Sequence, residues 1–224
     1  MKKAICLLSG GLDSATTLGI ALRDGYETSA LTINYGQLHQ KEIESAENIA
    51  KHFGIEHVSI RVPMPWGGSA LLDKNIPLPK GRNEDEMASG IPVSYVPARN
   101  TIFLSLAASF AEARGADVIF IGANAIDYSG YPDCRPDFFK AFQTVIARGT
   151  KCGIENKQIE IKAPLLELTK AEIIGLGYSL QIPYELTWSC YEGGKVPCGE
   201  CDSCKLRKKG FEGARCEDPL LMRQ

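Results

Sequence analysis

Six residues near the start of the chain combine hydroxyl, carboxylate and glycine chemistry: Ser9, Gly10, Gly11, Leu12, Asp13 and Ser14. They follow an apolar run at residues 4–8 and precede a helix-forming segment at residues 15–22, a pattern that predicts a strand, a tight loop and a helix start. Glycine allows the backbone to approach a bound group closely, and the free amides at a helix N-terminus attract anions. The stretch therefore predicts a phosphate-binding loop.

The loop differs from the two commonest nucleotide motifs. It lacks the Gly-Lys-Ser/Thr ending of a Walker loop and the third glycine of a dinucleotide fingerprint. It resembles the loop of the N-type ATP pyrophosphatases, in which amides and the hydroxyls of Ser9 and Ser14 would cradle the β- and γ-phosphates of ATP. Asp13 would position Mg²⁺ or orient the loop. The alternative is a glycine-rich turn in which serine and aspartate only cap a helix.

Four of the eight cysteines lie within fifteen residues: Cys190, Cys198, Cys201 and Cys204. Four thiolates form the closed tetrahedral ligand set of structural zinc, which leaves no position for water or substrate. An iron–sulfur cluster accepts the same ligands, but no redox partner feature accompanies them. The remaining alternative is a group of buried or disulfide-bonded cysteines. We expect a structural zinc site.

A third polar segment follows the predicted fourth strand and contains Asp127, Tyr128, Tyr131, Asp133 and Arg135. Aromatic faces can stack on a flat heterocycle, and a carboxylate can accept paired N–H donors from an aminopyrimidinone edge. The alternative is a capped surface turn.

Bulk properties limit the classes of function. The 224 residues suffice for one sizeable core or for one domain with a small appendage. Lys plus Arg number 25 and Asp plus Glu number 27, so the net charge of -2 provides no overall attraction to nucleic acid. Only five apolar residues follow the opening Met-Lys-Lys before Ser9, so we expect neither a signal peptide nor a membrane span, and we expect a cytoplasmic protein.

The remaining elements alternate between strand and helix. Strands are predicted at residues 3–8, 26–34, 56–62, 117–122 and 158–162. Helices are predicted between the first two strands and at residues 38–53, 100–114, 136–147 and 169–180, with Asn100 and Thr169 as N-caps and residues 169–172 as a capping box. This order predicts an α/β fold with an open, doubly wound parallel sheet in residues 1–180, and a small zinc-binding unit in residues 181–224.

One long segment interrupts the alternation. Residues 63–97 are rich in proline and glycine and lack periodicity, so we expect an insertion that acts as a lid or subunit contact, with a solvated acidic turn at residues 83–86. Ligands of open parallel sheets bind beyond the carboxyl ends of the strands. Residues 9–14, 34–39, the turn before Asn100 and residues 122–135 all meet that condition, and we take them as walls of one site.

Five motifs, taken in order, resemble the 7-cyano-7-deazaguanine synthases, a family of N-type ATP pyrophosphatases that supplies the queuosine and archaeosine precursor. They are residues 9–14, the Asn-Tyr-Gly-Gln run at 34–37 with His39, Val-Pro-Ala-Arg-Asn at 96–100, residues 127–135 and the four cysteines. The resemblance covers about residues 3–212. One departure is Leu38, where the family usually has arginine.

The resemblance implies ATP-dependent conversion of 7-carboxy-7-deazaguanine and free ammonia to the nitrile, through an adenylated acid and an amide. It also implies a homodimer with no direct nucleic-acid partner. Residues Leu8 to Ser14, namely Leu8, Ser9, Gly10, Gly11, Leu12, Asp13 and Ser14, would hold pyrophosphate with Mg²⁺, and Asn34 and Tyr35 would hold adenine or ribose. Ser9, Asp13, Ser14, His39 and Arg99 are the candidate catalytic residues, with His39 or Arg99 on phosphates. Asp133, then Asp127, would bind the deazaguanine edge, Tyr128 and Tyr131 would stack on it, and Arg135 would bind its carboxylate.

Two other functions share part of this pattern. A tRNA-thiolating relative would need a basic RNA-binding surface and a reactive cysteine pair outside the metal site, where only Cys6, Cys134, Cys152 and Cys216 remain. A non-catalytic nucleotide-binding module with a zinc knuckle would show no turnover that depends on acid and ammonia.

Overall fold

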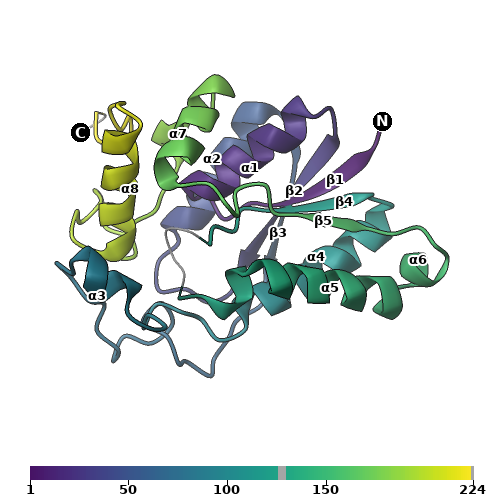
Figure 1. Ribbon diagram of the computed structural model, residues 1–224, viewed down its shortest axis with the longest axis horizontal. Helices are drawn as coiled ribbons and strands as arrows, with labels where there is room; N and C mark the ends of the chain where they lie inside the picture. The colour runs from purple at the N-terminus through teal and green to yellow at the C-terminus, as the bar shows by residue number, and fades with distance from the viewer. Residues whose placement is uncertain (126–129, 223–224) are drawn as a thin grey trace.

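A five-stranded, wholly parallel sheet forms the centre of the computed structural model, which describes residues 1–125 and 130–222 (Figure 1). The strands are β1 (Lys3–Leu7), β2 (Glu27–Asn34), β3 (Glu56–Arg61), β4 (Val118–Ile121) and β5 (Glu160–Lys162), in the order β3-β2-β1-β4-β5. The chain winds outward from β1 in one direction and then in the other, so the strand order reverses between β1 and β4. This reversal point is where open sheets bind their ligands.

Helices cover both faces of the sheet. On one face lie α1 (Leu12–Arg23), α2 (Lys41–Phe53) and α7 (Lys170–Ser179), with α8 (Asp202–Gly213) packed beside α7; on the other lie α4 (Arg99–Arg114) and α5 (Pro136–Gly149) (Figure 1). Alternate residues of β1 explain both cores, because Ile5 and Leu7 pack toward α4 and α5 while Ala4 and Cys6 pack toward α1 and α2. The predicted doubly wound α/β fold is confirmed.

Short elements complete the chain. They are α3 (Glu84–Ala88), α6 (Lys151–Ile154) and the 3₁₀ turns Pro132–Cys134 and Tyr184–Leu186. No helix within the described ranges is both long and apolar enough to span a membrane.

The predicted N-cap of α7 is confirmed, and the predicted N-cap of α4 is wrong. Thr169 and Glu172 form the predicted capping box of α7. Asn100 is not the cap of α4, since the helix begins at Arg99 after Ala98. The Asn100 side chain is buried and donates to the Asp133 carbonyl at 3.0 Å and to Cys134 Sγ at 3.3 Å, so tertiary partners decided its position.

The insertion at residues 63–97 is irregular except for α3, which replaces the predicted acidic turn because Asn83 and Glu86 form a second capping box. Its middle packs against the cysteine segment. Lys80 forms an isolated antiparallel bridge with Cys201, and the Gly81 N–H donates to the Glu200 carbonyl at 3.1 Å. The insertion runs from the end of β3 to the start of α4 and contacts the C-terminal cysteine segment on its way.

Candidate active site at the carboxyl edge of the sheet

The glycine loop between β1 and α1 is held by backbone contacts on two sides. Gly10 has φ +89°, and a Cβ there would lie 2.0 Å from the carbonyl oxygen of Glu42 in the first turn of α2. A Cβ on Gly122, which follows β4, would lie 2.9 Å from the backbone of Asp13 and Ser14. Both positions therefore exclude a side chain, and the loop sits at the reversal point of the sheet.

The loop's hydroxyls hydrogen-bond within the loop. Ser9 Oγ lies 3.0 Å from Ser14 Oγ, which donates to the Gly11 carbonyl at 3.0 Å. Gly11 is the N-cap of α1, and no side chain among the described residues caps the helix. This argues against the alternative in which serine and aspartate only cap the helix, and it leaves the first amides of α1 directed at the site.

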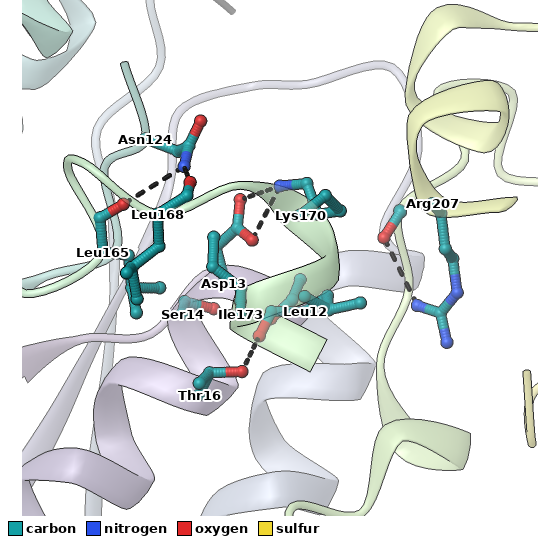
Figure 2. A network of polar contacts seen from close by, with 12 residues as sticks. Leu12, Asp13, Ser14, Thr16, Asn124, Leu165, Leu168, Lys170, Ile173 and Arg207 are labelled. Atoms are coloured by element: carbon teal, nitrogen blue, oxygen red, sulfur yellow. Dashed lines mark hydrogen bonds and ion pairs between the residues drawn. The ribbon is translucent and has the colours of Figure 1, made fainter. Parts of the chain in front are cut away.

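Asp13 is paired with a residue far away in the sequence. Lys170 Nζ lies 2.8 Å from both carboxylate oxygens of Asp13, and the two side chains are 15% and 28% exposed respectively (Figure 2). Nearby, the Asn124 amide donates to the Leu165 carbonyl at 3.1 Å and also to that of Leu168, which ties the end of β4 to the turn before α7 (Figure 2). The first turn of α7 thus stands against the glycine loop.

An apolar cavity of about 210 Å³ opens beside the loop. It runs along the ends of β1 and β2, and its distinctive lining is Leu31, Ile33, Tyr35, Ile43, Leu71 and Phe103. The Tyr35 ring lies on its wall, and burial raises the pKa of that phenol to about 12, so it stays protonated. The cavity suits a flat apolar ring system.

A second, more polar cavity of about 240 Å³ adjoins the first. It is lined by Gly11, Asp13, Asn124, Cys134, Lys170, Trp188 and Ser189, among others. Both cavities share Ser9, Ser14, Glu42, Arg99, Asn100, Ile121, Gly122, Tyr131 and Tyr191. The serine hydroxyls of the loop therefore stand at the boundary between an apolar and a polar compartment.

Three of the predicted residues from other segments reach the same place, namely Tyr35, His39 and Arg99, and a fourth, Asn34, does not. Arg99 lies over the Tyr35 ring at 5.7 Å, and its Nη1 is 3.5 Å from the Tyr35 hydroxyl. His39 lines the apolar cavity, and burial lowers its pKa, so the imidazole is neutral at pH 7. Asn34 lies outside both lining sets. Its side-chain Nδ2 donates to Gln40 Oε1 at 3.1 Å, and its side-chain Oδ1 accepts from the Gly36 N–H.

The three predicted substrate residues that the structure describes lie in three different places. Tyr131 lines both cavities, and its hydroxyl lies 3.0 Å from Ser94 Oγ of the insertion. Asp133 is buried, and its Oδ2 accepts from the Asn100 N–H at 2.9 Å, which stabilises the start of α4. Arg135 is exposed and precedes α5. Asp127 and Tyr128 lie outside the described residues.

The four cysteines form one compact group. The sulfur atoms of Cys190, Cys198, Cys201 and Cys204 all lie within 4.8 Å of one another, a spacing at which they could hold a metal ion. Two of these sulfurs also accept backbone N–H groups of the same segment, from Cys198 to Cys190 at 3.3 Å and from Cys201 to Cys198 at 3.4 Å. Four converging thiols whose orientation is fixed by amide donors are the donor set of a closed structural site.

Sequence reasoning missed several residues of this site. Glu42 and Lys170 lie in the first turns of correctly predicted helices, and Tyr191 and Trp188 lie beside the first metal-site cysteine. A signal existed for Glu42, because a helix that follows the loop at residues 34–39 must begin at the carboxyl edge. No local signal marks Lys170 as the partner of Asp13.

Comparison with known proteins decides the family. The model of the family described as "Queuosine biosynthesis protein QueC" matches residues 3–215. The chain belongs to this family. The family predicted from the sequence motifs is thereby confirmed.

Curated relatives agree over almost their full length. A protein of Thermoplasma acidophilum named 7-cyano-7-deazaguanine synthase is 52% identical over 98% of this chain and 91% of its own length. One of Trichodesmium erythraeum with the same name is 53% identical over 98% of this chain and 100% of its own length. Among solved structures, NMN synthetase from Francisella tularensis is 15% identical, with a TM-score of 0.49 over 96% of this chain and 88% of that one.

Proposed function

We propose that this family member converts 7-carboxy-7-deazaguanine and ammonia to 7-cyano-7-deazaguanine at the expense of ATP, through an adenylated acid and an amide. The carrying observation is the uncapped glycine loop at the boundary of two adjoining cavities, in a chain more than half identical to synthases of that name. A carboxylate is a poor electrophile, so adenylation supplies a leaving group for ammonia. Activation of the amide oxygen then allows dehydration to the nitrile.

ATP would span the boundary. Its adenine fits the apolar cavity beside Tyr35, with Asn34 close by at the end of β2, and its phosphates would lie on the amides and hydroxyls of residues 8–14. Arg99 and Lys170 supply positive charge on either side of the loop, which suits a triphosphate. Mg²⁺ would accompany the phosphates.

The acid would occupy the polar cavity. Tyr131 is one of the aromatic residues that line it, and its ring would stack on the deazaguanine. Asp133, Asp127, Tyr128 and Arg135 remain predictions for the purine edge, the stacking face and the carboxylate. Asp133 also holds the start of α4, so its substitution would disturb Arg99 and Asn100 as well.

The cysteine group would hold one zinc ion. The residues fit it, because four sulfur ligands converge with amide donors on two of them. Zinc bound there would supply folding stability rather than a Lewis acid, since four protein ligands close its coordination sphere.

Other partners follow from the same proposal. Free ammonia is the nitrogen donor. We extend the proposal to a homodimer, supported by the exposed side chains of Leu38 and Trp66, which line one surface hollow beside the insertion. The eight free cysteines support a cytoplasmic location. The division into residues 1–180 and 181–224 stays a prediction.

The test is mass spectrometry of the product formed from 7-carboxy-7-deazaguanine, ATP and ammonium. We expect the nitrile, and we expect its formation to fall at least about 100-fold in the double variant Asp13→Ala with Ser14→Ala. Absence of nitrile with the wild-type protein, together with a gel shift of tRNA, would instead indicate a tRNA-modifying relative. Near-normal turnover of the double variant would place the nucleotide elsewhere.

A further inference from the structure

Glu42 lies where the two cavities meet. Glu42 lies in the first turn of α2, and its backbone oxygen is the atom that a Cβ on Gly10 would strike. It is the one acidic residue, among the described residues, that lines both cavities. It makes no hydrogen bond or ion pair within that part of the chain. A half-buried carboxyl group without a partner is costly unless it has a use.

The other acid–base groups of the site are committed elsewhere. Asp13 is paired with Lys170, and Asp133 accepts the Asn100 N–H. Burial raises the pKa of the Cys134 thiol to about 11. Burial also raises the pKa of Tyr131. His39 lines only the apolar cavity, away from the polar lining.

The proposed reaction must remove protons from nitrogen more than once. Ammonium first loses one proton to give ammonia, whose electron pair forms the C–N bond with the acyl adenylate while AMP leaves with the C–O pair. Nitrogen then loses a second proton to give the neutral amide. The amide loses one proton when its oxygen displaces pyrophosphate from ATP. In the last step the N–H electron pair forms the third C–N bond, its proton is lost, and AMP leaves again. Each event needs a base beside the reacting nitrogen.

We infer that Glu42 is the general base that takes these protons, a role that rests on the proposed function. Its position suits the chemistry, because the acid in the polar cavity must meet the α-phosphate at the boundary that Glu42 lines. A carboxylate facing the boundary also attracts ammonium, the protonated form that predominates at neutral pH.

The surroundings of Glu42 adjust its proton affinity to the task. Burial raises its pKa to about 7, and the Arg99 cation opposes that rise. A base with a pKa near the working pH gains and releases protons readily. The titratable and charged groups around it come from four segments: Tyr35 and His39, Arg99, Tyr131, and Cys190 and Tyr191.

The experiment separates adenylation from the later steps. With the metal-loaded full chain, acid-dependent exchange of pyrophosphate into ATP reports the first activation, which needs no base, and nitrile formation reports the rest. In Glu42→Gln we expect exchange and the KM for ATP to stay within about threefold of wild type while kcat for nitrile falls at least about 100-fold. The wild-type kcat should rise with pH through about 7, because only the carboxylate accepts a proton, and the variant should lack that rise.

Two further variants complete the test. Glu47→Gln, on the exposed face of the same helix, should behave as wild type. In Glu42→Ala, added formate should restore part of the nitrile formation, which a structural role would not allow. The inference is overturned if Glu42→Gln loses pyrophosphate exchange as strongly as nitrile formation, or if it keeps both. A wild-type protein that exchanges no pyrophosphate would instead refute the proposed function.

Discussion

At the scale of single residues, the Asp13–Lys170 ion pair connects the glycine loop to the start of α7. Asp13 follows directly on the first residue of α1, where the helix dipole favours a negative charge. Lys170 is the first residue of α7 and comes from far along the chain. The pair is only partly exposed, so its attraction is less screened than that of a surface ion pair.

Substitution of Lys170 should lower the free energy of unfolding, and the size of the loss should depend on whether Asp13 is still charged. We expect Lys170→Met to lower the free energy of unfolding by about 2 kcal/mol, because it leaves the Asp13 carboxylate partly buried without a cation. Adding Asp13→Asn should recover part of the loss, with a coupling of about 1 kcal/mol in urea unfolding. The matched control is Lys151→Met with Glu155→Gln, an exposed pair with an expected coupling below about 0.5 kcal/mol. Additive effects at Asp13 and Lys170 would contradict the prediction.

At the scale of elements, a buried ion pair joins the insertion to α8. Arg82 Nε donates to Asp202 Oδ1 at 3.1 Å, and a second guanidinium nitrogen contacts Oδ2. These side chains are 18% and 4% exposed, and Lys205 Nζ also donates to the Arg82 carbonyl at 2.6 Å. Farther along the insertion, the backbone of Gly90 packs closely on Gly130. A Cβ on Gly130 would lie 2.6 Å from the Gly90 carbonyl oxygen. The insertion is thus held at the cysteine segment and at Gly130 in the turn that follows β4.

Loss of Arg82 should release the insertion. In Arg82→Met we expect a glutamate-specific protease to cleave after Glu84 and Glu86 at least about tenfold faster than in wild type, because the buried Asp202 carboxylate loses its ion pair with the guanidinium. Lys209→Met is the matched control, since it removes a contact between the same elements in which both side chains are over 60% exposed. Equal cleavage rates in the two variants would show that the ion pair does not hold the insertion.

At the scale of the whole molecule, the cysteine group is a small satellite core beside two large ones. Trp188 and the cysteines pack together, whereas the sheet is covered by its own clusters on both faces. Phe211 of α8 nevertheless belongs to the core of the sheet face that carries α1 and α7. A metal held by the cysteine group would therefore order the satellite core, whereas the two large cores order the sheet.

Removal of the metal should loosen one part of the molecule only. After treatment with a strong chelator we expect hydrogen exchange to accelerate at residues 190–206 and 80–90, which are bridged through Lys80 and Cys201, while β1 and β4 keep their protection. Mass spectrometry of deuterium uptake measures this, and chelator saturated beforehand with zinc is the control. Exchange that accelerates in β1 as well would mean that the metal stabilises the whole fold.

Local patterns in the sequence determined the strands, most helices, the glycine loop and the cysteine group. Burial on both faces leaves an apolar run in β4, glycine alone allows the loop's close contacts, and Thr169 with Glu172 signals the start of α7 by a local hydrogen-bond exchange. Only the tertiary structure decided that Lys170 pairs with Asp13, that Asn100 bonds to the turn at Asp133, and that Glu42 faces both cavities. The physical reason is that these side chains find partners across strands and helices distant in sequence, and local periodicity carries no information about such partners.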